Sequence, residues 1–236
     1  HIDTRYMDEA GITWMNCPGC NSSSVAQYMR SVLILLKNEK GMNPAGTTIG
    51  VVGCGHVGSK VAGVARQAGM RVLVCDPPLE LSGTAAGQYS FATLADIARE
   101  CDIITFHVPL TKDGPHATYH LADKAFMESL WRCPVIINTS RGSVVDNDAL
   151  ADALYINKVR DAVIDTWENE PDISLRLLDM AYIGTPHIAG YSADGKVNAD
   201  NMVLEGLCRH FGISLTDRII PPALPNAVFQ AAKDRL

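Results

Sequence analysis

The chain has 236 residues, of which 47% are hydrophobic and 19% are charged, and its formal net charge is −6 at pH 7. This length and apolar content can supply a full hydrophobic core, which favours a globular protein over a disordered one. The negative charge and the lack of a Lys/Arg cluster argue against nucleic acid as a partner. The longest apolar run, residues 32–36, is too short to cross a bilayer, so we expect no membrane contact.

The predicted elements alternate between strands and helices. Residues 1–21 end in a Pro-Gly turn, and residues 22–38 then form an apolar-faced pattern that predicts a helix with a serine N-cap. Short β-branched runs predict buried parallel strands at residues 47–53, 71–76, 102–108, 134–140, 161–166 and 181–185. Helices are predicted at residues 57–69, 91–100, 122–130, 146–158 and 192–211, with a proline-containing tail behind the last. The alternation predicts an α/β fold with a doubly wound parallel sheet of the Rossmann type.

A glycine-rich turn joins the first strand to its helix. Gly53, Gly55 and Gly58 form G-x-G-x-x-G, in which the first glycine permits a tight turn and the second lets the backbone approach a pyrophosphate. The third lets strand and helix pack closely, and the helix N-terminus offers free N–H groups to the phosphates. Asp76 ends the next strand at the distance expected for an acid that binds a ribose 2′-hydroxyl. A carboxylate there repels a 2′-phosphate, so the pattern favours NAD over NADP; the alternative is a structural turn with a strand-end aspartate.

Two later strand ends extend this predicted cofactor site. Residues 106–110, which include His107, Val108 and Pro109, would lie beside the adenosine half of the cofactor. Asp165 would accept the nicotinamide carboxamide, although an aspartate at a strand end also commonly serves only as a turn former.

Three side chains predict the chemistry. Arg141 follows a strand, and its planar guanidinium matches a carboxylate in a way that lysine cannot; the alternative is a surface arginine paired with Asp146 or Glu168. Glu170 precedes a proline and His187 follows one, and a carboxylate beside an imidazole stabilises the imidazolium. His187 would act as the base in oxidation and the acid in reduction. A packed, non-catalytic histidine is the alternative.

The motifs together resemble the D-2-hydroxyacid dehydrogenases. The resemblance rests on G-x-G-x-x-G with its following aspartate, on NTSRG (138–142), on WENEP (167–171) and on TPHIAG (185–190). Segments 17–21, 74–78, 106–121 and 184–196 are similar to the branch of the family that oxidises 4-phospho-D-erythronate in pyridoxal phosphate synthesis. A dehydrogenase for another D-2-hydroxy acid, such as 3-phosphoglycerate, and an NAD-sensing corepressor-like module remain the alternatives.

The resemblance implies residue roles. Arg141, Glu170 and His187 would be catalytic, and Tyr191 would contact the substrate together with Arg141 and His187. Contacts with NAD are implied at His56, Val57, Asp76, Val108, Thr139, Ser140, Arg141, Asp165 and Gly190. Valine at 108 departs from the threonine of the family branch, which would remove a hydroxyl contact. Lys196 lies in the matching stretch and receives no role.

The resemblance also implies a domain division. Residues 1–21 would be the end of a truncated substrate-binding domain, residues 22–191 the NAD-binding domain with its leading helix, and residues 192–236 a returning helix and tail. The start at His1 without methionine indicates a fragment or a processed chain, whose full-length parent would be a homodimer.

The seven cysteines indicate a cytoplasmic protein. Their number is odd and they are scattered along the chain, which is typical of reduced cysteines. Cys17 and Cys20 form C-x-x-C, but no second pair stands at ligand spacing, so we expect no metal site there.

Overall fold

The computed structural model describes residues 2–85 and 87–221. At its centre lies a six-stranded parallel sheet with the order β2-β1-β3-β4-β5-β6. The strands are β1 (Thr48–Val52), β2 (Arg71–Cys75), β3 (Ile103–Phe106), β4 (Val135–Asn138), β5 (Asp161–Ile164) and β6 (Ile183–Gly184). Each lies inside a predicted run, so the doubly wound α/β fold expected from the sequence is confirmed.

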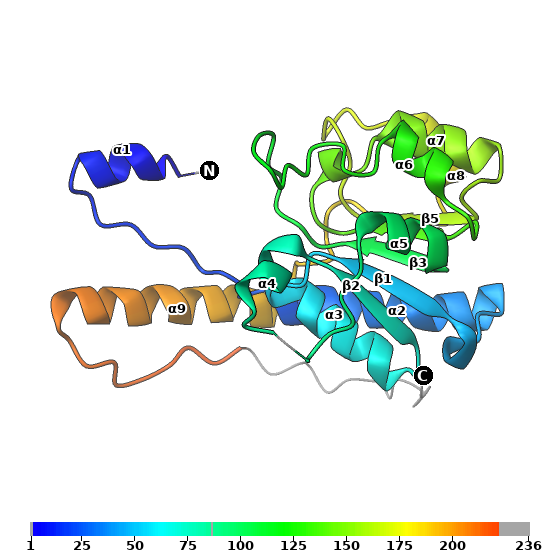
Figure 1. The fold of residues 1–236 in the computed structure, drawn as a ribbon. Helices are drawn as coiled ribbons and strands as arrows, with labels where there is room; N and C mark the ends of the chain where they lie inside the picture. The colour runs from blue at the N-terminus through cyan, green and yellow to red at the C-terminus, as the bar shows by residue number, and fades with distance from the viewer. Residues whose placement is uncertain (1, 86, 222–236) are drawn as a thin grey trace.

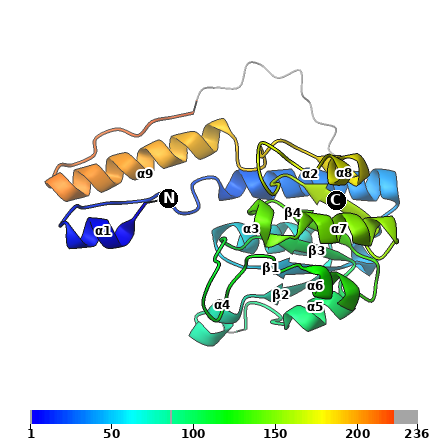
Figure 2. The same cartoon turned by 90° about the horizontal axis from the view of Figure 1, so that it is seen from above.

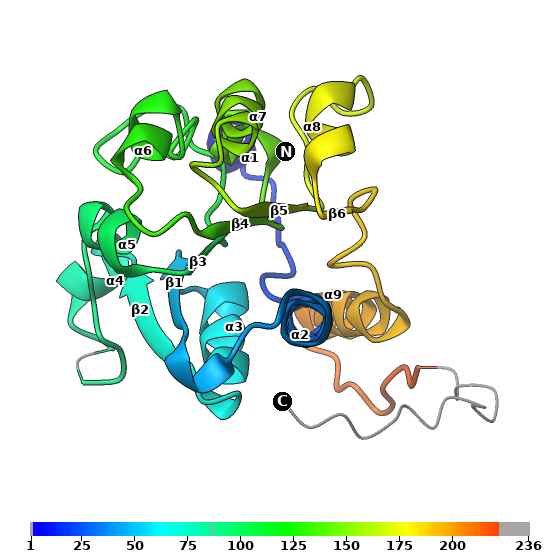
Figure 3. The same cartoon turned by 90° about the vertical axis from the view of Figure 1, so that its right-hand side faces the viewer.

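Helices cover both faces of the sheet (Figure 3). One face carries α2 (Ser22–Lys40) and α3 (His56–Gln67), and the other carries α5 (Leu94–Glu100), α6 (Lys124–Ser129), α7 (Asn147–Tyr155) and α8 (Leu175–Met180). Neighbouring side chains of a strand point to opposite faces, so Ile136 packs in the core beneath α5 to α8 and Ile137 in the core beneath α2 and α3. Because both faces are covered, the strands carry unbroken apolar runs rather than an alternating pattern.

The N-terminal arm, residues 2–21, and α9 (Ala193–Phe211) project from the sheet layer on the same side (Figures 1 and 2). Cys17 Sγ donates to the Ala199 carbonyl at 3.5 Å, and Asn198 Nδ2 donates to the Cys20 carbonyl at 3.2 Å. Further along, Gly206 lies against the Met15 side chain. The arm therefore runs along α9.

The predicted serine cap of the first long helix is wrong. Asn21 occupies the N-cap position of α2 without a side-chain hydrogen bond, and Ser22 is already helical, its hydroxyl donating to the Gly19 carbonyl at 2.6 Å. A serine cap occurs instead at α9, where Ser192 Oγ accepts from the Gly195 N–H at 2.9 Å. Both serines can satisfy a backbone group locally, and the turn before each helix decides which group that is.

Several short elements were not predicted. They are α1 (Thr4–Glu9), α4 (Pro77–Ser82), α8 and two single 3₁₀ turns, η1 (Pro44–Gly46) and η2 (Gly142–Val144). None is long enough to show an apolar period, which is the signal that reveals a helix in sequence. Within the described residues, no helix has the length and apolar content that a membrane span requires.

The glycine-rich turn depends on close backbone contact. Gly53 has φ +85°, a left-handed conformation that glycine adopts without strain. A Cβ on Gly58, in the first turn of α3, would overlap the Gly53 carbonyl oxygen. By contrast, a Cβ on Gly63, further along the same helix, would meet nothing within 4 Å. Of these three glycines, only Gly53 and Gly58 are required by the turn.

These two helical glycines give a matched pair of alanine variants. We expect Gly58→Ala to lower the free energy of unfolding by about 1–3 kcal/mol, because the added methyl overlaps backbone. Gly63→Ala should raise it by up to about 1 kcal/mol, because alanine has the better helix propensity. Urea unfolding followed by circular dichroism measures both. Equal effects at the two positions would contradict the close contact.

Candidate functional site: the carboxyl edge of the sheet

The strand order reverses between β1 and β3, and this is where open α/β sheets bind ligands. The turn after β1 and the segment after β3 lie against each other at this point. A Cβ on Gly53 would stand 2.7 Å from the His107 carbonyl oxygen and 2.6 Å from Val108 Cγ1. The glycine-rich turn and the predicted adenosine-side segment are therefore in contact, and their binding of a cofactor stays a prediction.

The N-terminus of α3 fits a phosphate group. Gly55 occupies its N-cap position with no side-chain hydrogen bond, so no cap competes for the first N–H groups of the helix. A Cβ on Gly55 would meet nothing within 4 Å, so the space in front of the turn is open. His56 and Val57 begin the helix. Free N–H groups and the positive helix end suit the pyrophosphate of a dinucleotide.

Asp76, which directly follows β2, is hydrogen-bonded to the glycine-rich turn that follows β1. Its Oδ2 accepts from the Cys54 N–H of the glycine-rich turn at 2.7 Å. Its Oδ1 accepts from the Leu79 N–H at 3.0 Å and so caps α4. Each carboxylate oxygen keeps a second lone pair. The aspartate thus holds the turn, and its contact with a ribose stays a prediction.

His107 is a neutral bridge between β3 and β4. Its Nε2 is 2.9 Å from Thr105 Oγ1, and its Nδ1 is 3.4 Å from Thr139 Oγ1. Burial lowers the pKa of His107 to about 3, so the ring is uncharged at neutral pH. It can order Thr139 and the segment up to Pro109 without adding charge to the site.

The loop that carries Arg141 is organised by Asn138. Asn138 is fully buried at the end of β4; its Nδ2 donates to the Arg141 carbonyl at 2.9 Å, and its Oδ1 accepts from the Ser140 hydroxyl at 2.9 Å and N–H at 3.1 Å. The Arg141 guanidinium is exposed and donates to the Ser140 carbonyl at 2.6 Å. No ion pair of Arg141 with Asp146 or Glu168 is found among the described residues. The guanidinium is thus available to an anionic ligand.

His187 and Glu170 form the predicted pair. His187 Nδ1 is 2.9 Å from Glu170 Oε2, and Glu170 Oε1 accepts from the Trp167 N–H at 2.8 Å. Partial burial raises the pKa of Glu170, but the hydrogen bonds from His187 and Trp167 and the charge of Arg141 outweigh it and hold that pKa below its ordinary value. The Glu170–Pro171 peptide bond is cis. With Nδ1 held by an ionised carboxylate, Nε2 remains available for proton transfer.

Asp165 anchors the loop that carries His187. Its side chain is buried, with Oδ1 accepting from Thr185 Oγ1 at 2.6 Å and from the Ile188 N–H at 2.8 Å. Oδ2 accepts from the Ala189 N–H at 2.9 Å. The Asp165 carbonyl accepts from the His187 N–H at 2.8 Å, and His187 itself has φ +56°. Asp165 therefore fixes the histidine loop to β5, a role the sequence did not reveal; the carboxamide contact stays a prediction.

Tyr191 and Gly190 lie just beyond this loop. The Tyr191 hydroxyl accepts from Lys196 Nζ at 2.7 Å, and this hydrogen bond and the lysine charge lower the pKa of Tyr191. A Cβ on Gly190 would overlap the Asn21 side chain, so glycine is needed for the loop to pack on the start of α2. Tyr191 is 71% exposed, so a ligand can reach it.

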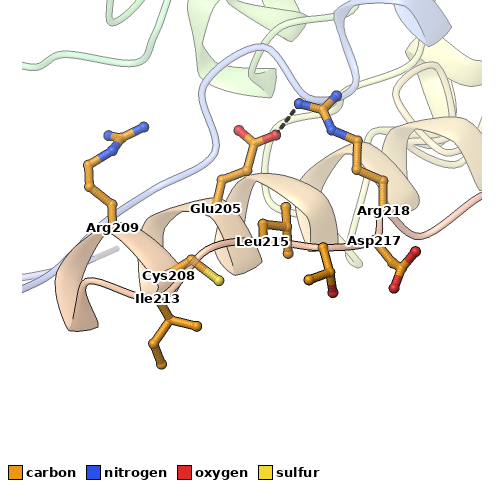
Figure 4. Close-up of a pocket in the computed structure, with 8 residues that line it drawn as sticks. Glu205, Cys208, Arg209, Ile213, Leu215, Asp217 and Arg218 are labelled. Carbon is orange, nitrogen blue, oxygen red and sulfur yellow. Dashed lines mark hydrogen bonds and ion pairs between the residues drawn. The ribbon is translucent and has the colours of Figure 1, made fainter.

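The predicted catalytic residues lie in the loops that follow β4, β5 and β6, at one edge of the sheet. Pro171 and His187 also line a mainly apolar pocket of about 440 Å³ with Trp167, Ile173 and Leu178. A larger groove lies elsewhere, between α9 and the segment after it, where Glu205 and Arg218 form an ion pair (Figure 4). No predicted site residue lines that groove.

Four of the cysteines lie in a turn or in the core, away from the proposed catalytic residues. Cys17 and Cys20 lie in a turn, with the Cys20 N–H donating to the Cys17 carbonyl at 3.3 Å. Burial raises the pKa of Cys75 to about 11 and that of Cys101 to about 12, so both thiols stay protonated. In residues 2–85 and 87–221, no group of three or more His, Cys, Asp or Glu side chains could hold a metal ion.

Residues 23–189 match the protein family described as D-isomer specific 2-hydroxyacid dehydrogenase, NAD binding domain. The fold, the glycine-rich turn and the His187–Glu170 pair already define a nucleotide-binding domain of the dehydrogenase class. The chain belongs to the D-isomer specific 2-hydroxyacid dehydrogenase family and contains its NAD-binding domain.

Relatives within the family carry a more specific name. The chain is 55% identical over 235 residues to erythronate-4-phosphate dehydrogenase of Bacteroides thetaiotaomicron, a match that covers 100% of the chain and 66% of the relative. It is 46% identical over 225 residues to the enzyme of the same name from Porphyromonas gingivalis, covering 94% of the chain and 60% of the relative. The chain thus spans somewhat less than two thirds of the length of these relatives.

Solved structures support the fold. The apo form of Rhodotorula graminis D-mandelate dehydrogenase superposes with a TM-score of 0.79 at 23% identity, over 94% of this chain and 73% of that one. Aquifex aeolicus D-lactate dehydrogenase, solved with NAD and lactic acid, gives a TM-score of 0.72 at 26% identity, over 90% of this chain and 73% of that one. The shared architecture is the doubly wound domain.

The buried position of the Asp165 carboxylate predicts that replacing it with an amide lowers the stability of the fold. Asp165→Asn places an N–H₂ group against backbone N–H donors, so we expect the free energy of unfolding to fall by about 1–3 kcal/mol. Asp200→Asn is the control, because Asp200 is exposed on α9 and its replacement should change stability by less than about 0.5 kcal/mol. Chemical unfolding measures both, and similar values for the two variants would contradict the anchoring role.

The Glu170 carboxylate predicts a pH-dependent contribution to stability. Its folded pKa lies below the unfolded value of about 4.3, so the stabilisation is present above that pH and is lost as pH falls through the lower folded pKa. The stability difference between the unmodified chain and Glu170→Gln should therefore be largest above about pH 5 and shrink towards about pH 3. Glu128→Gln, an exposed carboxylate on α6, serves as the control in unfolding experiments over this range. A difference that grows on acidification would show the sign to be wrong.

Proposed function

We propose that this chain is the cofactor-binding and proton-transferring part of an NAD-dependent dehydrogenase. Its substrate would be 4-phospho-D-erythronate and its product 2-oxo-3-hydroxy-4-phosphobutanoate, a step in pyridoxal phosphate (vitamin B6) synthesis. The observation that carries the proposal is the His187–Glu170 pair, 2.9 Å apart, at the carboxyl edge of an NAD-binding domain. The substrate follows from the relatives that are 55% and 46% identical to the chain and are named erythronate-4-phosphate dehydrogenase.

The proposed mechanism divides the oxidation between a hydride and a proton. NAD bound at the glycine-rich turn would supply the acceptor for the hydride of C2 of the hydroxy acid. His187 Nε2 takes the proton of the C2 hydroxyl as the carbonyl forms. Glu170, held to Nδ1, stabilises the resulting imidazolium, and Arg141 binds the substrate carboxylate. Tyr191 contacts the substrate beside the histidine.

The cofactor contacts follow the carboxyl edge. The glycine-rich turn and the N-terminus of α3 hold the pyrophosphate, Asp76 binds the ribose hydroxyls, and Asp165 lies at the nicotinamide end. The full proposed set is Gly53, Gly55, His56, Val57, Gly58, Asp76, His107, Val108, Pro109, Thr139, Ser140, Arg141, Asp165 and Gly190. The open space at Gly55 and the absence of a side-chain cap on α3 support it.

The domain division and the cellular setting complete the proposal. Residues 1–21 would belong to a substrate-binding domain, residues 22–191 to the NAD-binding domain, and residues 192–236, of which 222–236 lie outside the described residues, to the returning helix and tail. We propose a cytoplasmic protein, supported by seven free cysteines, that binds no nucleic acid, in keeping with its charge of −6. The homodimer implied by the family resemblance can be tested by analytical ultracentrifugation of the natural full-length protein.

Steady-state kinetics of the natural protein that contains this chain test the function. We expect NAD-dependent oxidation of 4-phospho-D-erythronate, with a higher kcat/KM than for 3-phosphoglycerate or D-lactate. His187→Ala should lower kcat by about 10²–10⁴-fold, the usual effect of losing a general base. His210→Ala is the control, because His210 lies in the last turn of α9 and should not affect the rate.

Three outcomes would contradict the proposal. A preference for 3-phosphoglycerate would show that the substrate is wrong. An unchanged rate in His187→Ala would remove that residue from the mechanism. Binding of NAD without oxidation of any hydroxy acid would favour the corepressor-like module instead.

A further inference from the structure

A second histidine–carboxylate cluster lies at the carboxyl edge and has no part in the mechanism above. It contains His120, Glu168 and Asp146, one from each of the three loops that follow β3, β5 and β4. His120 Nε2 is 2.7 Å from Glu168 Oε1, and His120 Nδ1 is 3.7 Å from Asp146 Oδ2. The three side chains are 28%, 16% and 26% exposed, so they are shielded from water over most of their surface. We call this group the loop clamp.

Each member of the loop clamp also has a backbone contact, and all three contacts are made with the segment that follows β4. Glu168 Oε2 accepts from the Asn147 N–H at 2.9 Å, and Asp146 Oδ1 caps α7 by accepting from the Ala149 N–H at 3.0 Å. The His120 N–H donates to the Ser143 carbonyl at 2.7 Å, and the ring stacks on Tyr119 with centroids 4.1 Å apart. The clamp is therefore a rigid junction rather than a chance surface contact.

The backbone of His120 is held in an unfavourable conformation. Its φ is +48°, in the left-handed region, which costs a residue with a Cβ roughly 1 kcal/mol. The contacts of the ring and of the backbone N–H must offset this conformational free-energy cost. Glycine would adopt this backbone conformation without the steric cost, so a histidine here indicates that the ring itself has a role.

The loop clamp touches both loops that carry the proposed catalytic groups. Glu168 lies two residues before Glu170 in the loop after β5, and Asp146 lies five residues after Arg141 in the loop after β4. These two loops press together, because a Cβ on Gly142 would overlap the Trp167 carbonyl. Trp167 in turn donates its N–H to Glu170 at 2.8 Å. A shift of either loop would therefore move Arg141 relative to the His187–Glu170 pair.

We propose that His120 is a positioning residue that, by bridging Glu168 and Asp146, sets the separation of Arg141 and Glu170. The proposal rests on the proposed function. Two carboxylates face the ring: Glu168 Oε1 is at hydrogen-bond distance from Nε2, and Asp146 Oδ2 lies 3.7 Å from Nδ1. The imidazole lies between the two acids and can offer an N–H to Glu168, whereas an apolar side chain offers none. Lys112 Nζ lies 5.9 Å from the centre of the Tyr119 ring, which stacks on His120.

Kinetics of three variants test the positioning role in the natural full-length protein. His120→Leu should lower kcat/KM for the hydroxy acid by about 10–100-fold, since small misplacements of reacting groups have effects of this size. The dissociation constant of NAD should change less than kcat/KM does, because the proposed pyrophosphate and ribose contacts, at the turn after β1 and at Asp76, are not part of the loop clamp. His120→Gln, which keeps a neutral donor for Glu168, should recover part of the loss. The control His116→Leu, at an exposed position of the same loop, should behave as the unmodified protein.

Amide hydrogen exchange on the same variants separates this inference from the proposed function. His120→Leu should accelerate exchange at Asn147 and Trp167, whose N–H groups bind Glu168 and Glu170, and leave Gly53 and His107 unchanged. Faster exchange with unchanged kinetics would overturn the positioning role, as would unchanged exchange. If the unmodified protein oxidised no hydroxy acid, the proposed function would be wrong. In that case, exchange that stays slow in His120→Leu would also show that the loop clamp does not hold the loops together.

Discussion

The buried carboxylate of Asp165 accepts three hydrogen bonds from the segment that follows β6, and the position of His187 depends on them. That segment has no regular structure of its own, and His187 within it has a left-handed backbone. Without an anchor, such a loop would sample many conformations, and the imidazole would not stay near Glu170. Because Asp165 directly follows β5, which lies between β4 and β6, these hydrogen bonds fix the histidine loop to the sheet.

The same edge shows how charge is distributed around the proposed reaction. His107 is kept neutral by burial, whereas His187 is paired with the ionised carboxylate of Glu170. Arg141 lies close enough to Glu170 to help lower its pKa. One histidine therefore orders threonines beside the proposed cofactor site, and the other is proposed to take a proton and to be stabilised as a cation. The loop clamp around His120 adds a third environment, in which the ring bridges two loops.

Much of this arrangement was predictable from particular residues. The unbroken apolar runs gave all six strands, because strands buried on both faces carry no polar alternation. Gly53, Gly55 and Gly58 indicated the turn, and the structure shows that Gly53 and Gly58 make contacts too close for a Cβ. The histidine–glutamate pair followed from its motifs and is confirmed as a hydrogen bond of 2.9 Å. Less visible were Asn138 and His120, whose partners lie in loops that are distant along the sequence or have no periodic pattern.

The amino-acid sequence by itself determined the fold class, the place of the dinucleotide turn and the identity of the proposed catalytic set, because these depend on local periodicity and on residues with few alternative uses. The tertiary structure alone decided how the set is held. Asp165 was expected to face the cofactor, yet its carboxylate accepts from residues 185, 188 and 189. Likewise, the clamp joins residues 120, 146 and 168, which no spacing rule connects. The physical reason is that hydrogen bonds between loops depend on the order in which strands assemble, and that order is a property of the whole sheet.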